Sequence, residues 1–258
     1  MARLKEYNGH YCESEYEYAF IGFLEAEGWK YSSGNNISRV TKRDVLIADD
    51  FKKFIADTNP DLTEDEVTKI YDNVRLVGAE SDFATLHKVY GWMVNGVQFT
   101  PQDELPRMIP LIDFDNWNKN IFRVVNQFTV EYTNNGQKEN RRPDVLLFVN
   151  GIPLCVIELK NPTDANATIY DAWEQINIRY WRDIPHLLHY CPLACISDGV
   201  KTRLGTVRTP YEHFYAWRRV NEGDAVSTLP FAETETMIKG VYSPERFLEI
   251  FRDYIYFQ

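Results

Sequence analysis

Hydrophobic and polar positions follow one period in the first part of the chain and another in the second. In the first part, apolar residues recur at helical spacing, which predicts helices over residues 14–29, 63–74 and 82–93. Ser14 is a suitable N-terminal cap and Gly28 a suitable stop for the first of these helices. Thr63 and Glu66 have the spacing of a capping box at the start of the second. Residues 1–110 are therefore predicted to form a mainly helical part.

After Pro110 the pattern becomes that of strands, with alternating β-branched and aromatic residues. Two apolar runs, 144–149 and 153–159, flank the dipeptide Asn150-Gly151, which is a strong hairpin signal. A helix is expected from about residue 165, a buried strand over 192–199 and a last helix over 244–256. This order predicts an α/β fold in residues 111–258, with a mixed central sheet flanked by helices.

The composition is that of a globular protein, with 44% hydrophobic and 26% charged residues among 258. Lys and Arg number 28 against 38 Asp and Glu, and the net charge of -10 argues against a basic domain that grips nucleic acid non-specifically. Acidic clusters are also how proteins bind divalent metal ions. There is no apolar run of membrane-spanning length and no secretion segment, and the four cysteines show no paired framework. We therefore expect a cytoplasmic protein without membrane contact or disulfides.

Two charged residues stand in or directly after the apolar run 153–159. Glu158 and Lys160 are two residues apart and would project from one face of a strand, and Asp144 lies across the hairpin. Two carboxylates brought together repel each other unless a cation or a proton joins them. These carboxylates, with the Leu159 carbonyl and water, suit Mg²⁺ or Mn²⁺, and Lys160 would orient a water in phosphodiester hydrolysis. The alternative is a half-exposed strand with a weak Glu-Lys pair.

The register of the hairpin decides whether this site can form. A strict two-residue turn would pair Asp144 with Ile157 and turn Glu158 to the other face. A three-residue loop, with Val149 opposite Pro153, would pair the two carboxylates instead. We predict the second arrangement or an equivalent bulge.

The segment 141–168 resembles the nuclease core of the PD-(D/E)XK superfamily, and specifically the restriction (R, or HsdR) subunit of type I restriction-modification systems. The resemblance extends to LIDFDN (111–116), VVNQFTVE (124–131), DIPHLLHY (183–190) and ISDG (196–199). It thus covers most of the chain and implies a restriction-endonuclease-like sheet. The helical first third matches only loosely.

The resemblance implies that Asp144 and Glu158 bind the metal and that Lys160 is the catalytic lysine. Many relatives also carry an acidic residue on the first helix. Glu17 is the best candidate for it, and Glu13 lies one turn earlier on the same face. A solvated acidic helix face is an equally good interpretation of either residue.

The family also has a Gln and a Tyr spaced as Gln-x-x-x-Tyr on the helix after the catalytic strand. Here Gln175 and Tyr180 are one residue further apart, and Arg179 stands at the expected tyrosine position. Gln175 is a candidate site residue, whereas the role of Tyr180 is open. Gln175 and Arg179 would share an α-helical face and could contact the DNA backbone or support Lys160.

As function, the resemblance implies Mg²⁺- or Mn²⁺-dependent cleavage of double-stranded DNA in a complex with modification (M) and specificity (S) subunits. ATP would be used only by a translocase, and no phosphate-binding loop of the Gly-x-x-x-x-Gly-Lys-Ser/Thr type occurs in this sequence. We therefore expect the N-terminal part of a longer subunit. A stand-alone nuclease without ATP coupling and a non-catalytic subunit-docking module are the alternatives.

Two weaker candidates remain. A compact group of side chains could suggest zinc, although its spacing matches no common ligand pattern: His186, His189, Cys191 and Cys195. Three basic residues before the hairpin could meet phosphates or form an ordinary charged turn: Lys138, Arg141 and Arg142.

Overall fold

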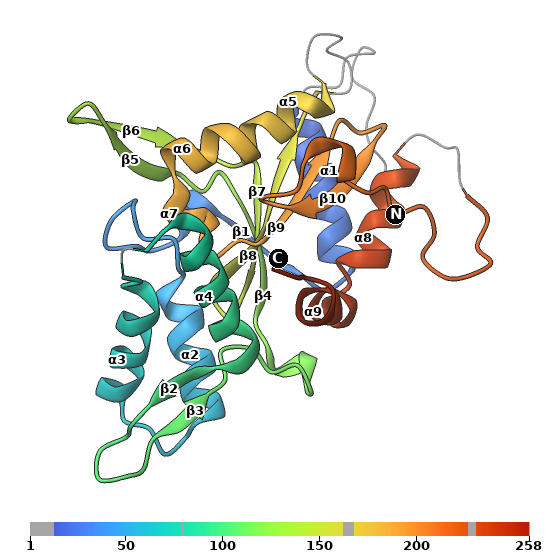
Figure 1. The fold of residues 1–258 in the computed structure, drawn as a ribbon. Coiled ribbons are helices and arrows are strands. Elements are labelled where there is room, and N and C mark those ends of the chain that lie inside the picture. The colour runs from blue at the N-terminus through green and yellow to red at the C-terminus, as the bar shows by residue number, and fades with distance from the viewer. Residues whose placement is uncertain (1–12, 79, 162–167, 227–230, 258) are drawn as a thin grey trace.

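The computed structural model describes residues 13–78, 80–161, 168–226 and 231–257 (Figure 1). The helices are α1 (Glu13–Ala26), α2 (Ala48–Thr58), α3 (Glu64–Arg75), α4 (Asp82–Asn95), α5 (Ile169–Glu174), a π-helix (Gln175–Tyr180), α6 (Trp181–Asp183), α7 (Pro185–Leu188), α8 (Ala232–Val241) and α9 (Pro244–Asp253). Short 3₁₀ helices cover Gly34–Asn36, Trp117–Lys119 and Tyr211–His213. The strands are β1 (Lys30–Ser33), β2 (Val97–Phe99), β3 (Arg107–Ile109), β4 (Phe122–Asn126), β5 (Val130–Asn134), β6 (Gln137–Arg141), β7 (Val145–Val149), β8 (Ile152–Leu159), β9 (Leu193–Ser197) and β10 (Thr202–Thr206).

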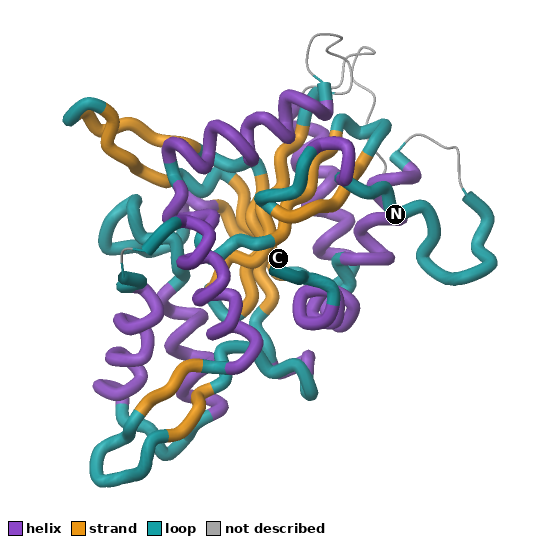
Figure 2. The backbone as a smooth tube through the Cα atoms, viewed as in Figure 1, coloured by secondary structure: helices purple, strands orange, loops and turns teal. Residues whose placement is uncertain are grey.

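A six-stranded mixed sheet in the order β1-β4-β7-β8-β9-β10 forms the centre of the molecule (Figures 1 and 2). The pairs β1–β4 and β8–β9 are parallel, and the other three pairs are antiparallel. Every residue of β7, β8 and β9 is buried, which explains why their sequences are nearly continuous apolar runs. The predicted α/β class with a mixed central sheet is confirmed.

The tip of the β7–β8 hairpin is a two-residue turn. Val149 pairs with Ile152, and Asn150 and Gly151 form the turn with φ of 50° and 75°. Asn-Gly is favoured here because both positions need positive φ. The three-residue loop expected from the sequence is therefore wrong.

A bulge further along the hairpin restores the register that the site requires. The pairing shifts between Leu147 and Phe148, so that Val145 pairs with Ile157. Asp144, directly before β7, and Glu158 in β8 are then opposite each other, and these are the two carboxylates predicted to bind metal. The bulge that the sequence predicted as an equivalent of the longer loop is therefore present.

Helices cover both faces of the sheet. On one face, the hydroxyl of Tyr16 in α1 lies 2.6 Å from Oγ of Ser197, which is the neighbour of Leu159 in the β8–β9 pair. On the other face, the hydroxyl of Tyr180 in the π-helix donates to Glu158. Since consecutive residues of a strand point to opposite faces, α1 and the π-helix lie on opposite sides of β8.

Helices α2, α3 and α4 and the β2–β3 ribbon form a group beside the turn end of the β7–β8 hairpin (Figure 1). The amide of Ile47, just before α2, donates to the Gly151 carbonyl at 2.8 Å. Arg123 of β4 binds Asp50 of α2 through two contacts of 2.6 and 2.7 Å. The helical group is thus fixed to the sheet by buried polar contacts.

The first part of the chain contains elements that its pattern did not predict. β1 is short and half-exposed, yet it joins the central sheet as a parallel partner of β4. α2 follows Ile47, whose side chain provides no cap hydrogen bond, so this helix lacks a start signal in the sequence. The three predicted helices are confirmed as α1, α3 and α4, and the capping box at Thr63 is present.

In the part of the chain that the structure describes, no helix has both the length and the apolar character needed to cross a membrane.

Candidate active site

Glu158 is the only charged residue of β8, and its side chain is fully buried. Its Oε1 accepts a hydrogen bond of 2.6 Å from the Tyr180 hydroxyl, whereas no described residue gives Oε2 a hydrogen bond. Burial, and secondarily the charge of Asp144, raise the pKa of this carboxyl well above its usual value. A buried carboxylate oxygen without a partner is costly, so this atom is poised to meet a cation or a proton.

Asp144 lies opposite Glu158 and is tied to the same strand. Its Oδ2 accepts a hydrogen bond of 2.8 Å from the backbone amide of Leu159. In a strand the N–H and C=O groups of one residue point to the same side, so the Leu159 carbonyl also faces β7. Two carboxylates and one carbonyl oxygen therefore converge at the end of the hairpin.

This donor set fits a hard divalent cation only in part. Among the described residues, no three His, Cys, Asp or Glu side chains come together in a metal-binding group. Mg²⁺ commonly binds through one or two carboxylates and completes its shell with water and substrate phosphate. The oxygen-only donors and the unpartnered Oε2 of Glu158 therefore fit Mg²⁺ or Mn²⁺ better than zinc.

A continuous chain of hydrogen bonds links the lysine of the site to its buried carboxylate. Lys160 Nζ donates to Gln175 Oε1 at 2.9 Å, and Gln175 Nε2 donates to the Tyr180 hydroxyl at 2.9 Å. Tyr180 in turn donates to Glu158. Burial and the neighbouring Glu158 charge raise the tyrosine pKa, so the phenol keeps the proton that it donates.

The π-helix explains why Tyr180 reaches the site despite its altered spacing. A π-helix closes its hydrogen-bonded turn over one residue more than an α-helix, so it accommodates the extra residue between Gln175 and Tyr180. Arg179, which stands at the family's tyrosine position, is 52% exposed and lies 3.7 Å from Glu174. The structure therefore brings Tyr180, and not Arg179, to Gln175 and Glu158.

Glu17 is buried on α1 but is not joined to the two carboxylates. Its Oε1 accepts a hydrogen bond of 2.6 Å from Asn126, and Gln127 donates to it at 3.3 Å. These two amides at the end of β4 were not singled out in the sequence, although they stand in the matched run VVNQFTVE. The alternative, Glu13, begins α1, and its side chain lies outside the description. A catalytic role for Glu17 stays a prediction.

The zinc interpretation finds no support. His189 lies 2.8 Å from Asp82, and Cys191 and Cys195 are fully buried free thiols. Burial lowers the pKa of His186 to about 4, so this imidazole is neutral. As noted above, no metal-binding group of such side chains is found in the described part of the chain.

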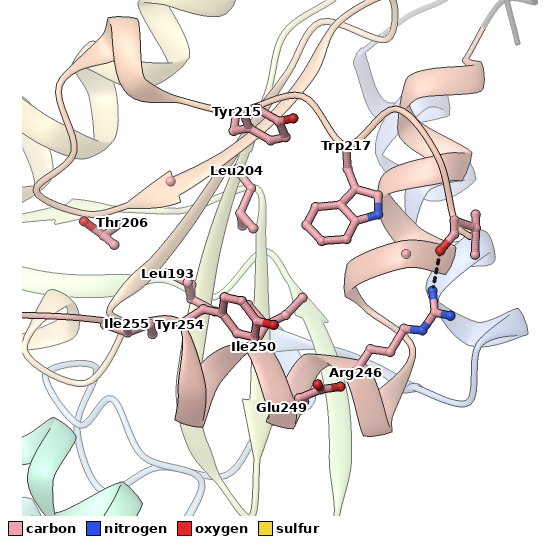
Figure 3. Close-up of a pocket in the computed structure, with 13 residues that line it drawn as sticks. Leu193, Leu204, Thr206, Tyr215, Trp217, Arg246, Glu249, Ile250, Tyr254 and Ile255 are labelled. Atoms are coloured by element: carbon pink, nitrogen blue, oxygen red, sulfur yellow. Dashed lines mark hydrogen bonds between the residues drawn. The ribbon is translucent and has the colours of Figure 1, made fainter. Parts of the chain in front are cut away.

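A cavity of about 430 Å³ lies away from the site, between β10, the segment after Tyr215 and helices α8 and α9 (Figure 3). Its walls are largely apolar and include Trp217, which packs against Gly240. None of its lining residues is one of the predicted site residues.

A family model described as "Type I restriction enzyme R protein N terminus" matches residues 11–213 of this chain. The chain belongs to this family. The matched range contains the hairpin, the π-helix and both site carboxylates.

Named relatives agree with this assignment. The chain is 32% identical to a candidate type I restriction enzyme MjaIXP endonuclease subunit of Methanocaldococcus jannaschii, over 93% of this chain and 25% of that protein. It is 30% identical to the type I restriction enzyme HindI endonuclease subunit of Haemophilus influenzae, over 95% of this chain and 24% of that protein. A SauCOLORF180P endonuclease subunit of Staphylococcus aureus is 34% identical over 39% of this chain and 10% of its own length. The chain thus spans about a quarter of the length of the first two relatives.

Proposed function

We propose that this member of the R protein N-terminal family is the nuclease region of a type I restriction enzyme, and that it hydrolyses phosphodiester bonds of double-stranded DNA with Mg²⁺ or Mn²⁺. The observation that carries the proposal is the register of the hairpin, in which Val145 pairs with Ile157 and Asp144 therefore comes opposite Glu158, whose Oε2 is buried and unpartnered among the described residues. The names of the relatives support an endonuclease.

The residues of the hairpin end have distinct tasks in this proposal. Asp144, Glu158 and the Leu159 carbonyl would hold the cation, which when bound polarises the scissile phosphate and lowers the pKa of an attacking water. The Lys160 ammonium orients the water or neutralises charge that develops on the phosphate.

The π-helix supplies the positioning groups. Gln175 accepts from Lys160 and therefore fixes the ammonium next to the hairpin. Tyr180 satisfies Oε1 of Glu158 and leaves the other carboxylate oxygen available to the cation. Neither residue needs to touch the substrate for these tasks.

The remaining parts of the proposal come from the family. Modification and specificity subunits would be the protein partners, and ATP would be consumed by a translocase region outside the present sequence. Cleavage by this chain would then be weak without the rest of the complex.

Isothermal titration of Mn²⁺ and Mg²⁺, paired with a plasmid-nicking assay on the same samples, tests the proposal. We expect the unaltered chain to bind metal, and the Asp144→Ala and Glu158→Ala variants to lose binding. Lys160→Ala should keep metal binding and lose nicking, because the lysine would not be one of the ligands of the cation. Asp57→Ala, at an exposed acid of α2, is the matched control and should change neither measurement.

The alternatives correspond to different results. Strong nicking by the chain alone, without ATP, would favour a stand-alone nuclease. Absence of metal binding in this chain and in a full-length subunit would remove the catalytic proposal and favour a docking module.

A further inference from the structure

Two segments near the β7–β8 hairpin carry a net positive charge, although the chain as a whole is negative. Residues 39–43 and 130–142 together contain six Lys or Arg and two Glu, whereas the whole chain has 28 Lys and Arg against 38 Asp and Glu. The second segment comprises β5 and β6, a two-stranded ribbon that projects from the body of the molecule (Figures 1 and 2). We call these two segments together the basic ribbon surface.

The loop and the ribbon of this surface are held together. The amide of Glu131 in β5 donates to the Lys42 carbonyl at 2.9 Å. Arg39 donates to the Thr129 carbonyl at 2.9 Å, and its guanidinium lies 3.8 Å from the centre of the Phe128 ring. The loop is therefore bonded to β5 and to the residues just before it, and the two segments form one surface.

The ribbon is also anchored to α6. Arg141 binds Asp183 at 2.7 Å, and its guanidinium lies 5.2 Å from the centre of the Tyr132 ring. The anchor uses the charge of Arg141 and sets the direction in which the ribbon leaves the sheet.

The two acidic side chains of the surface have polar partners, whereas three of its basic side chains form no ion pair with a described residue. Glu139 accepts from a tyrosine and an asparagine of β5, and Glu131 lies 3.2 Å from Lys138. Lys42, Arg43 and Arg142 are exposed, and none of them forms an ion pair with any residue that the structure describes. These three charges are therefore available to an external anion.

The place and shape of the surface indicate which anion it meets. Arg142 is two residues before Asp144, so a phosphate bound by this arginine lies close to the proposed catalytic carboxylates. Each strand of the ribbon has five residues, a length of roughly 17 Å. A two-stranded ribbon of this size fits the major groove of a DNA duplex, whose flanking phosphates attract lysine and arginine.

We propose that the basic ribbon surface binds the backbone of duplex DNA and directs it to the Asp144 end of the hairpin. The inference rests on the proposed nuclease function and assigns the DNA-binding surface of that site. Recognition here is by backbone charge, so it is independent of base sequence.

Fluorescence anisotropy with a labelled duplex of about 30 base pairs, roughly three helical turns, tests this inference. The titration is made in EDTA so that no cleavage occurs, over salt concentrations from about 50 to 200 mM. The ribbon variant carries Lys42→Ala, Arg43→Ala and Arg142→Ala. The control variant removes three exposed cations elsewhere: Lys69→Ala, Arg218→Ala and Arg219→Ala. Circular dichroism verifies that both variants are folded.

We expect the ribbon variant to bind at least ~10-fold more weakly at the lowest salt, and its salt slope to fall by about 2.7, because each lost phosphate contact removes roughly 0.9. The control variant should bind almost as the unaltered chain does, and restoring charge with Arg142→Lys should recover part of the affinity. Equal weakening in both variants, or no duplex binding by the unaltered chain, would overturn the inference. Binding through the ribbon, together with absence of metal binding in this chain and in a full-length subunit, would instead count against the catalytic proposal alone.

Discussion

Replacing Glu158 with Gln should stabilise the metal-free protein at alkaline pH and change it little at acid pH. Burial, and then the charge of Asp144, raise the pKa of Glu158 well above the ordinary value of 4.5. A group whose pKa is raised by folding contributes stability that is complete below its unfolded pKa and is lost as the pH rises through its folded pKa. Glutamine has the same shape, can still accept from Tyr180, and has no proton to lose.

The size of the effect follows from the complete burial of the side chain. At high pH, each unit by which the pKa in the folded state exceeds that in the unfolded state lowers the free energy of unfolding by about 1.4 kcal/mol. For a domain of this size, a change of 1 kcal/mol corresponds to ~2–4 °C in Tm. We therefore expect Glu158→Gln to raise Tm by at least ~3 °C at about pH 8.5 in EDTA, with a difference near zero at about pH 5.

Thermal unfolding followed by circular dichroism measures this difference. Adding Mn²⁺ at the higher pH should raise the Tm of the unaltered chain and leave that of Glu158→Gln almost unchanged, since a bound cation stabilises only the state that binds it. Glu235→Gln, at an exposed acid of α8, is the matched control. If Glu158→Gln shifted Tm equally at both pH values, the carboxyl would not be the origin of the pH dependence, and the reasoning would be refuted.

Three further changes test other parts of the structure. Tyr180→Phe removes the hydroxyl bound to Glu158, which is worth ~1.5–3 kcal/mol for a charged acceptor, so nicking should fall roughly 10-fold or more; an unchanged rate would contradict the positioning role. Deleting Ile178, which is 49% exposed, should convert the π-helix to an α-helix and preserve metal binding by titration calorimetry, whereas deleting the buried Ile176 should unfold the segment. Gly151→Ala should lower the free energy of unfolding in urea by ~1–3 kcal/mol, because φ is 75° and the added Cβ would meet the Ile47 carbonyl; a loss below ~0.5 kcal/mol would contradict this account.

The sequence predicted the centre of the fold better than its edges. β8 was predictable because a buried strand is a continuous apolar run, and a charged residue inside such a run, as at Glu158, marks a site. β1 was not, because its four half-exposed residues have no alternation, and its place in the sheet depends on pairing with β4, far along the chain. Helix α2 was missed because it begins without a capping side chain.

The site shows the same limit at the level of single residues. Strand periodicity and the hairpin signal singled out Asp144, Glu158 and Lys160, but the local pattern did not place the bulge that brings Asp144 opposite Glu158. Tyr180 required knowledge of the helix type, because residue spacing has a meaning only for a given number of residues per turn. The two amides that hold Glu17 belong to Asn126, the last residue of β4, and to Gln127 after it, and no local pattern could connect them to α1.

The bulge between Leu147 and Phe148 makes the site depend on parity. The tight turn fixes the pairing of the two strands at one end. Beyond it, one unpaired residue in the bulge changes the sequence separation of opposing residues from odd to even. One more inserted or deleted residue between the bulge and Asp144 would turn that carboxylate to the opposite face of the sheet, and a change of two would return it to the same face but displace it by roughly 7 Å from Glu158. The hairpin can therefore change in length and keep the two carboxylates opposite each other only when both strands change together, so the geometry of the pair is encoded as much by residue count as by residue type.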